Sequence, residues 1–295
     1  MNKSFTLIEI LVVIVVVGIL SSFILVGMSS ITSSANIAKS KAFSNSLRDS
    51  LLMNLVSEWK LDGNGVDSWG SNTGTLYGTP TLKTSSDCVS EGCYQFDGIN
   101  DYIDCGNNPS LWMRNNDHTA SFWVRFDGIT STQYEVLIGC STTGTTSTGY
   151  WIYRPPNTNG LYLYFNNGSA HSSGGLASVL ATNSWLNIVI TMDRDGLAKA
   201  YINGQIQSNS FDMSSYVGDI QNAISLRIGG YDSSNYRLAG RMDDVKIYHA
   251  IHSSFLINEE YYSGINKLFK NNGITLNEFN QRIVELKSNL SQNGF

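Results

Sequence analysis

Residues 183–205 read NSWLNIVITMDRDGLAKAYINGQ, and this stretch decides the fold class of the chain. WLNIVITMD has the length and the β-branched content of a buried strand, and the turn signal Asp195-Gly196 closely follows it. LAKAYI is the next short strand, and Asn203-Gly204 then turns the chain into QIQS. Short strands joined by tight turns predict a run of antiparallel hairpins.

Alternation of apolar and polar residues recurs on both sides of these hairpins. In residues 118–126, Ala120, Phe122 and Val124 fall on one face of a strand. In residues 161–165, leucine and phenylalanine alternate with tyrosine in the same way. Further short strands are predicted at 135–139, 150–154, 225–228 and 241–248. About ten to fourteen strands over residues 58–264 predict an antiparallel β-sandwich of the jelly-roll type, so the chain is expected to be mainly β.

The N-terminal segment has a different pattern. Residues 5–28 read FTLIEILVVIVVVGILSSFILVGM and contain one charged residue, Glu9. Because a helix of about 20 apolar residues crosses a bilayer, we predict a transmembrane helix here. The run is longer than the roughly 7–15 apolar residues of a secretory signal peptide. Helical spacing continues beyond the run and predicts one long helix over residues 5–57, with a Ser-rich flexible stalk after residue 28 as the alternative.

The first nine residues resemble the processing signal of type IV pilins, pseudopilins and related prepilins. The basic leader MNKS precedes Phe5, and Glu9 is the fifth residue counted from Phe5. The resemblance implies that a prepilin peptidase removes residues 1–4, that the new amino group is methylated, and that Glu9 neutralises the terminal amine of a neighbouring pilin subunit. Ser4 departs from the family, which has Gly before the cut. The head is then expected outside the inner or cytoplasmic membrane, on a pilus or the cell surface.

Five stretches within residues 58–264 resemble, in order, the laminin-G-like domains of the concanavalin A-like lectin/glucanase superfamily. They are EWKLDGNGVDSWGSNTGTLYG, YQFDGINDYIDCG, TASFWVRF, NSWLNIVITMDRDGLAKAYINGQ and LRIGGYDSSNYRLAGRMDDVKIYHAIHS. The resemblance implies a Ca²⁺ site that fastens the opening loop to the closing strand. The expected ligands are Asp62, Asp67, Asn72 and one of Asp243 and Asp244, with Asp243 favoured. A metal-free, hydrogen-bonded turn is the alternative.

The sequence argues against catalysis and against nucleic-acid binding. Glu58, Glu91 and Glu135 are each isolated in the predicted sandwich, whereas glycoside hydrolysis needs two carboxylates about 5–10 Å apart. His249 and His252 have the spacing of zinc ligands but lack further partners. A formal net charge of −5 gives no general attraction for a polyanion. We therefore predict no catalytic residue, and no nucleic acid as a partner.

The four cysteines and the C-terminal tail complete the pattern. Cys88 and Cys93 are spaced to close a small disulfide loop, while Cys105 and Cys140 either pair or remain buried thiols.

Residues 265–295 are predicted to be a helical tail whose second part begins at a Thr275–Glu278 capping box. Its apolar stripe is expected to dock on the sandwich or on the long helix; its members are Leu276, Phe279, Ile283, Leu286 and Leu290.

These patterns predict a minor pilin or a pilus-associated adhesin, assembled through its N-terminal helix and not an enzyme. Its expected partners are the prepilin peptidase, other pilin subunits, the assembly machinery and the membrane, with a glycan or protein ligand on the head. One alternative is a membrane-anchored carbohydrate-binding surface protein, or less favourably a glycan-hydrolysing one. A second alternative is the pseudopilin of a secretion system.

Overall fold

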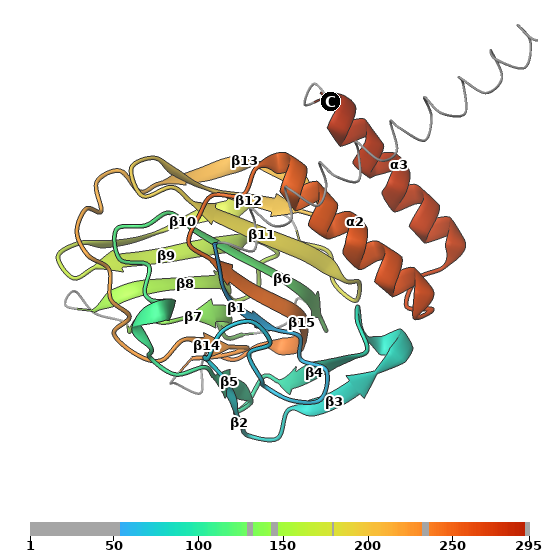
Figure 1. Cartoon of the computed structure of the whole chain (residues 1–295), viewed down its shortest axis with the longest axis horizontal. Helices are drawn as coiled ribbons and strands as arrows, with labels where there is room; N and C mark the ends of the chain where they lie inside the picture. The colour runs from blue at the N-terminus through green and yellow to red at the C-terminus, as the bar shows by residue number, and fades with distance from the viewer. Residues whose placement is uncertain (1–53, 129–131, 143–146, 179, 232–235, 293–295) are drawn as a thin grey trace, which may run out of the picture. The chain divides into compact units, whose positions relative to one another are not determined.

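The computed structural model describes residues 54–292, except 129–131, 143–146, 179 and 232–235. The predicted long helix over 5–57 and the processing residues Ser4, Phe5 and Glu9 therefore lie almost wholly or entirely outside the described residues. Two antiparallel sheets make a β-sandwich, and two helices follow it (Figure 1). The predicted mainly β sandwich is confirmed. Within the described residues, no helix combines the length and the apolar character that crossing a membrane requires.

Sheet A has eight strands in the order β13-β12-β11-β6-β15-β4-β3, and β1 pairs with β15 beside that path. Its strands are β1 (Leu55–Trp59), β3 (Thr81–Thr84), β4 (Gly92–Asp97), β6 (His118–Phe126), β11 (Leu186–Met192), β12 (Leu197–Ile202), β13 (Gln205–Asp212) and β15 (Ala239–Tyr248). The predicted hairpins of residues 183–205 are β11, β12 and the start of β13. Asn203 and Gly204 both have positive φ, as a tight turn of this kind requires.

Sheet B has seven strands in the order β10-β9-β8-β7-β14-β5-β2. Its strands are β2 (Thr75–Tyr77), β5 (Tyr102–Asp104), β7 (Glu135–Gly139), β8 (Thr148–Arg154), β9 (Leu161–Asn167), β10 (His171–Ala177) and β14 (Arg227–Ile228). Figure 1 shows β7 to β10 side by side in green and yellow-green. Sequence neighbours pair directly from β7 to β10, so the chain meanders across this half of the sheet.

The main core lies between the sheets and is built from every second residue of the central strands. Phe122 and Val124 of β6, with Ile188 of β11, are fully buried on the inner face of sheet A. On the facing sheet, Leu163 and Phe165 of β9 enter the same cluster. The alternation read from the sequence thus assigned these side chains to the correct face.

One element crosses each of the two predicted domain boundaries, at residues 57 and 264. Strand β1 begins at Leu55, inside the helix predicted to end at residue 57, because residues 55–59 pair with β15 and bury every second side chain. At the other end, helix α2 (Ser254–Lys270) crosses the predicted boundary at residue 264. Gly264 lies within this helix, where an added Cβ would overlap the Trp123 ring. The glycine permits close packing and does not end a helix.

Helices α2 and α3 (Leu276–Gln292) cover the outer face of sheet A. The ring of Tyr261 stacks on Trp123 of β6, with ring centroids 5.9 Å apart. The Glu260 carboxylate accepts hydrogen bonds from Ser121 Oγ at 3.0 Å and from Lys246 Nζ at 2.7 Å. Helix α3 packs on α2, where Phe279 stacks on Phe269 at 4.7 Å. Phe279 of the predicted apolar stripe therefore packs on the preceding helix, whereas Leu276 is 57% exposed.

Candidate functional site

Asp67, one of the predicted Ca²⁺ ligands, ties the opening loop to β1 through backbone amides. Its Oδ1 accepts hydrogen bonds from the backbone N–H of Glu58, Trp69 and Gly70 at 2.9–3.1 Å, and its Oδ2 accepts one from Asn72 at 2.9 Å. Burial opposes the charged form, but these four bonds favour it and lower the pKa of Asp67. The Asn72 side chain in turn donates to Ser57 Oγ at 2.7 Å.

Asp62 and Asp243 meet at Ser90. The Ser90 hydroxyl lies 2.8 Å from Asp243 Oδ1 and 3.1 Å from Asp62 Oδ1. Asp243 Oδ2 also accepts the backbone N–H groups of Val89 and Ser90, at 2.8 and 2.9 Å. Burial, reinforced by the neighbouring Asp244 carboxylate, raises the pKa of Asp243 well above its usual value. This group therefore fastens the loop of residues 88–93 to the closing strand.

Asp244 has a third set of partners. Its φ of 47° belongs to a left-handed residue at a bulge in β15, and its carboxylate pairs with Lys267 Nζ of α2 at 2.7 Å. The five predicted ligands thus belong to three separate hydrogen-bonded groups. A cation needs oxygen lone pairs that face it, whereas the oxygens of Asp67 and Asp243 face N–H donors. The five residues do not fit a single Ca²⁺ site.

The predicted disulfide between Cys88 and Cys93 is present. Its loop belongs to the buried cluster beneath the helices, which includes Val89, Trp185 and Leu268. The Asn271 side chain, at the end of α2, donates to the Val89 carbonyl at 3.2 Å.

Cys105 and Cys140 do not pair with each other and are both buried thiols, which is one of the two alternatives that the sequence left open. Burial raises the pKa of Cys140 to about 12, which favours the neutral thiol over the thiolate.

Glu135, considered above as an isolated carboxylate, forms an almost fully buried ion pair with Arg154. Burial raises the pKa of Glu135, and the Arg154 guanidinium opposes that shift. Glu135 also accepts the backbone N–H of Ala239 at 3.2 Å. Both carboxylate oxygens therefore have partners within the fold, as expected for a structural group.

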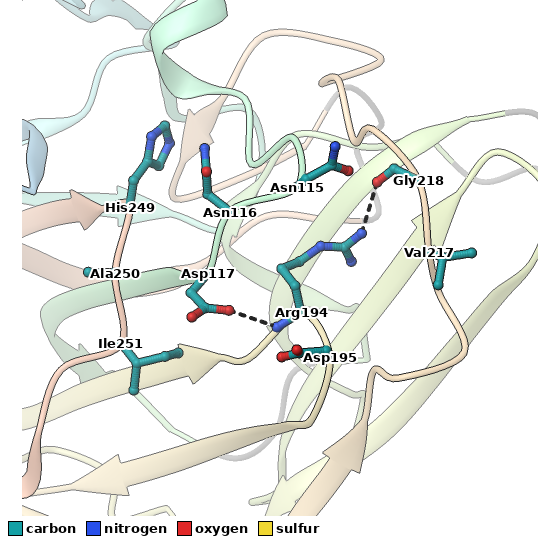
Figure 2. A pocket seen from close by; sticks show the side chains of 10 residues that line it. All are labelled: Asn115, Asn116, Asp117, Arg194, Asp195, Val217, Gly218, His249, Ala250 and Ile251. Carbon is teal, nitrogen blue, oxygen red and sulfur yellow. Dashed lines mark hydrogen bonds between the residues drawn. The ribbon is translucent and has the colours of Figure 1, made fainter.

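A cleft of about 810 Å³ opens where the loops before β6 and after β11, β13 and β15 converge (Figure 2). Arg194 is held at its wall by Nη2 hydrogen bonds to the Tyr216 and Gly218 carbonyls, at 2.8 and 3.0 Å. Its backbone N–H donates to Asp117 Oδ1 at 3.0 Å. Carboxylate oxygens of Asp117, Asp193 and Asp195 lie within 4.8 Å of one another. The turn signal Asp195-Gly196 gave no indication of this cluster, because Asp117 is distant along the chain.

Aromatic side chains gather on the outer face of sheet B, on the opposite side from the main core. We call this set the ring face; its members are Tyr134, Trp151, Tyr153, Tyr162, Tyr164, His171, Tyr231 and Tyr236. Trp151 and Tyr164 are direct partners across β8 and β9, and their rings stack with centroids 4.7 Å apart. Tyr153 and Tyr162 are the next direct partners on these strands, and their tilted rings have centroids 5.8 Å apart.

The ring face has two tiers. Trp151, Tyr153 and Tyr231 are at most 7% exposed and form the lower tier. Tyr162, Tyr164 and Tyr236 are half-buried above them, and Tyr134 is 40% exposed. Gly139 makes room for one ring, since a Cβ there would lie 2.9 Å from Trp151 Cδ1. The sequence contained a signal for this face, because two of its tyrosines, Tyr162 and Tyr164, occupy alternate positions within residues 161–165.

Two family models match parts of the chain. Residues 97–254 match the model of the concanavalin A-like lectin/glucanases superfamily. Residues 1–25 match the prokaryotic N-terminal methylation motif. Both resemblances read from the sequence are confirmed. No curated protein matches the sequence.

Solved structures show the same fold in clostridial toxin domains. The binding domain of Paraclostridial Mosquitocidal Protein 1 has a TM-score of 0.59 at 18% identity, over 73% of this chain and 53% of that one. The ligand binding domain of Botulinum neurotoxin serotype D, in complex with N-acetylneuraminic acid, has a TM-score of 0.58 at 17% identity, over 74% and 52%. This chain spans about half the length of these structures, and at such identities the likeness shows the fold alone.

Proposed function

Because this chain belongs to the concanavalin A-like lectin/glucanases superfamily, and because a prepilin-type motif precedes that domain, we propose that it is a minor pilin or pilus-associated adhesin. The N-terminal segment anchors the protein in the membrane and carries it into a filament. The sandwich is displayed outside the membrane as a non-catalytic binding head. The fusion of these two parts in one chain is the observation that carries the proposal.

Three residues perform the assembly steps in this proposal. The prepilin peptidase cuts between Ser4 and Phe5, and the new terminal amine is methylated while keeping its positive charge. Glu9 provides the opposite charge, which is strongly attractive to an amine at low dielectric and costly when left alone. The partners are therefore the peptidase, the other pilin subunits and the assembly machinery.

The disulfide supports a head outside the cytoplasm, because such bonds persist in oxidising compartments. The Glu135 carboxylate is paired with Arg154 inside the fold, and the thiols of Cys105 and Cys140 are buried. Both observations support a binding role over a catalytic one. Calcium is not part of the proposal, since the expected ligands have N–H and lysine partners instead.

The proposal is tested by mass spectrometry of the N-terminal peptide in sheared filaments and in membranes. The expected mature chain begins at a methylated Phe5. Replacing Glu9→Ala should leave membrane insertion intact, since the segment becomes more apolar, and should remove the protein from filaments. The matched control Glu9→Asp keeps the charge and should retain assembly better than Glu9→Ala. Replacing Ser4→Gly should leave processing equal or improved.

A start at Met1 in surface material, or normal filament entry of Glu9→Ala, would contradict the pilin assignment. A processed chain found only in membranes would favour the membrane-anchored carbohydrate-binding protein. A processed chain whose loss blocks secretion would favour the pseudopilin.

A further inference from the structure

The ring face is an organised surface outside the main core, and the assembly steps described above do not use it. Its rings form a cluster of their own that contains no residue from either helix. Large aromatic groups left half-exposed together on a soluble domain mark a site of interaction more often than chance. We propose that the ring face binds a neutral saccharide chain, which lies across β8 and β9. This inference rests on the proposed role of the head as a binding module.

The two tiers fix the upper rings before any ligand arrives. Tyr164 is held by its stack on Trp151 at 4.7 Å, and Trp151 is held in turn by Tyr231 at 4.8 Å. The Tyr164 hydroxyl accepts a hydrogen bond from Asn166 Nδ2 at 3.1 Å. Tyr236 stacks on Tyr134 at 5.3 Å. Tyrosine has few rotatable bonds, so binding to rings already held in place costs little conformational entropy.

The chemistry of the surface selects the ligand class. Each tyrosine offers an apolar ring with a hydroxyl at its tip, which suits a partner that alternates C–H faces with hydroxyl groups. Seven of the eight members are Tyr or Trp, so a ligand gains no ion pair from them. On the neighbouring strands, Arg227 of β14 already forms an ion pair with Asp104 of β5 at 3.2 Å. A pyranose chain without charged groups meets these conditions, and a polyanion does not.

The geometry also gives the direction of the ligand. Trp151–Tyr164 and Tyr153–Tyr162 are successive pairs on the same face of two strands, two residues apart along each. A spacing of two residues corresponds to about 7 Å along a strand. Successive rings can therefore contact successive sugar units of an extended chain. The cleft of Figure 2 differs from this surface, because its walls carry carboxylates, amides and one guanidinium.

Binding is tested on the full-length protein, purified in lauryldimethylamine oxide because this detergent has no sugar headgroup. The probes are cellohexaose, maltohexaose, mannohexaose and xylohexaose, with sialyllactose as an acidic comparison, titrated by tryptophan fluorescence and by saturation-transfer NMR. At least one neutral hexasaccharide should bind. Tyr162→Ala and Tyr164→Ala should each weaken that binding on the order of tenfold.

Two further variants separate binding from folding. Tyr262→Ala removes a tyrosine that is 46% exposed on α2, outside the ring face, and should leave binding unchanged. Tyr162→Leu keeps the bulk above Gly175 without the ring, and should keep the thermal midpoint while losing affinity. The proposal is overturned if no neutral hexasaccharide binds at millimolar concentration, if only sialyllactose binds, or if the ring-face variants bind normally. Loss of binding in Asn116→Ala would place the ligand in the cleft and would also overturn it.

These outcomes are independent of filament assembly. An unprocessed or unassembled protein that still binds the hexasaccharide would contradict the pilin assignment and leave this inference standing. A processed filament subunit that binds none of the probes would support the pilin assignment and overturn the inference that the ring face binds a saccharide.

Discussion

The two outer faces of the sandwich differ in what lies on them. On sheet A, helices α2 and α3 cover the strands through a stacked Trp123–Tyr261 pair, the Glu260 carboxylate and the disulfide loop. On sheet B, the ring face presents half-buried tyrosines above a buried tier. The same fold thus uses one outer face for stability and leaves the other for recognition.

The largest expected effect concerns Glu260 on the covered face. Burial opposes its charge, but Lys246 and His252 outweigh burial and lower the pKa of Glu260 to about 2. A folded-state pKa below the ordinary value of 4.5 contributes stability above pH 4.5, and this contribution is lost as pH falls towards 2. Glu260→Gln should therefore lower the free energy of unfolding by about 3 kcal/mol at pH 7.

Urea unfolding at several pH values checks this prediction. The difference between Glu260→Gln and the unaltered protein should shrink between pH 4.5 and pH 2, where the lowered pKa of Glu260 is titrated. The neighbouring Glu259 is exposed on the same helix, and Glu259→Gln should change stability by less than about 0.5 kcal/mol. Equal losses in the two variants would mean that the helix does not cover sheet A in this way.

The disulfide should have the next largest effect. Replacing Cys88→Ser and Cys93→Ser together removes a short cross-link whose contribution is about 2 kcal/mol. Differential scanning calorimetry should show a lower midpoint, while hexasaccharide binding at the ring face is retained. Reductant should lower the midpoint of the unaltered protein and leave the double variant unchanged. A simultaneous loss of binding would show that the two faces are not independent.

One substitution, glycine to alanine, compares the faces directly. At Gly264 the added Cβ would overlap the Trp123 ring, so Gly264→Ala should cost about 1–3 kcal/mol despite the higher helix propensity of alanine. At Gly175 the nearest ring atom of Tyr162 would be 3.4 Å away, an ordinary contact, and Gly175→Ala should change stability by less than about 0.5 kcal/mol. Chemical denaturation of both variants measures the contrast, and a reversed order would refute it.

The smallest expected effect is that of calcium. Asp67 and Asp243 accept backbone N–H groups, so neither a chelator nor added Ca²⁺ should move the thermal midpoint. Asp67→Ala should lower it, because four backbone N–H groups would lose their acceptor. A midpoint that falls with chelator and recovers with Ca²⁺ would restore the metal site that the family resemblance implied.

The sequence predicted those features that depend on local pattern. Alternation assigned Phe122 and Val124 to the core, and the short spacing of Cys88 and Cys93 predicted their bridge. Local pattern failed at residues 55–57, because strand β1 exists only through pairing with β15, almost two hundred residues later. It failed again at the predicted boundary at residue 264, because Gly264 lies within α2 and packs on Trp123 of β6.

The candidate site was less predictable for a related reason. Aspartates in a loop have the same sequence signature whether they face a cation or backbone N–H groups, and only the fold distinguishes the two. The ring face combines residues of several strands with Tyr231 and Tyr236, which lie far along the chain from residues 161–165. Residues 161–165 alone could therefore show alternating tyrosines but not their stacking partners.

The proposed ligand surface of the head is the ring face. Hydroxyl-radical footprinting of the full-length protein, with and without the neutral hexasaccharide that binds best, tests this proposal most directly. We predict reduced oxidation of Tyr162, Tyr164 and Tyr236 in the bound state, and unchanged oxidation of the exposed Tyr262 on α2. Protection confined to the cleft segments 115–117 and 249–251, with the ring-face tyrosines still fully reactive, would show that the ligand binds in the cleft and not on the ring face.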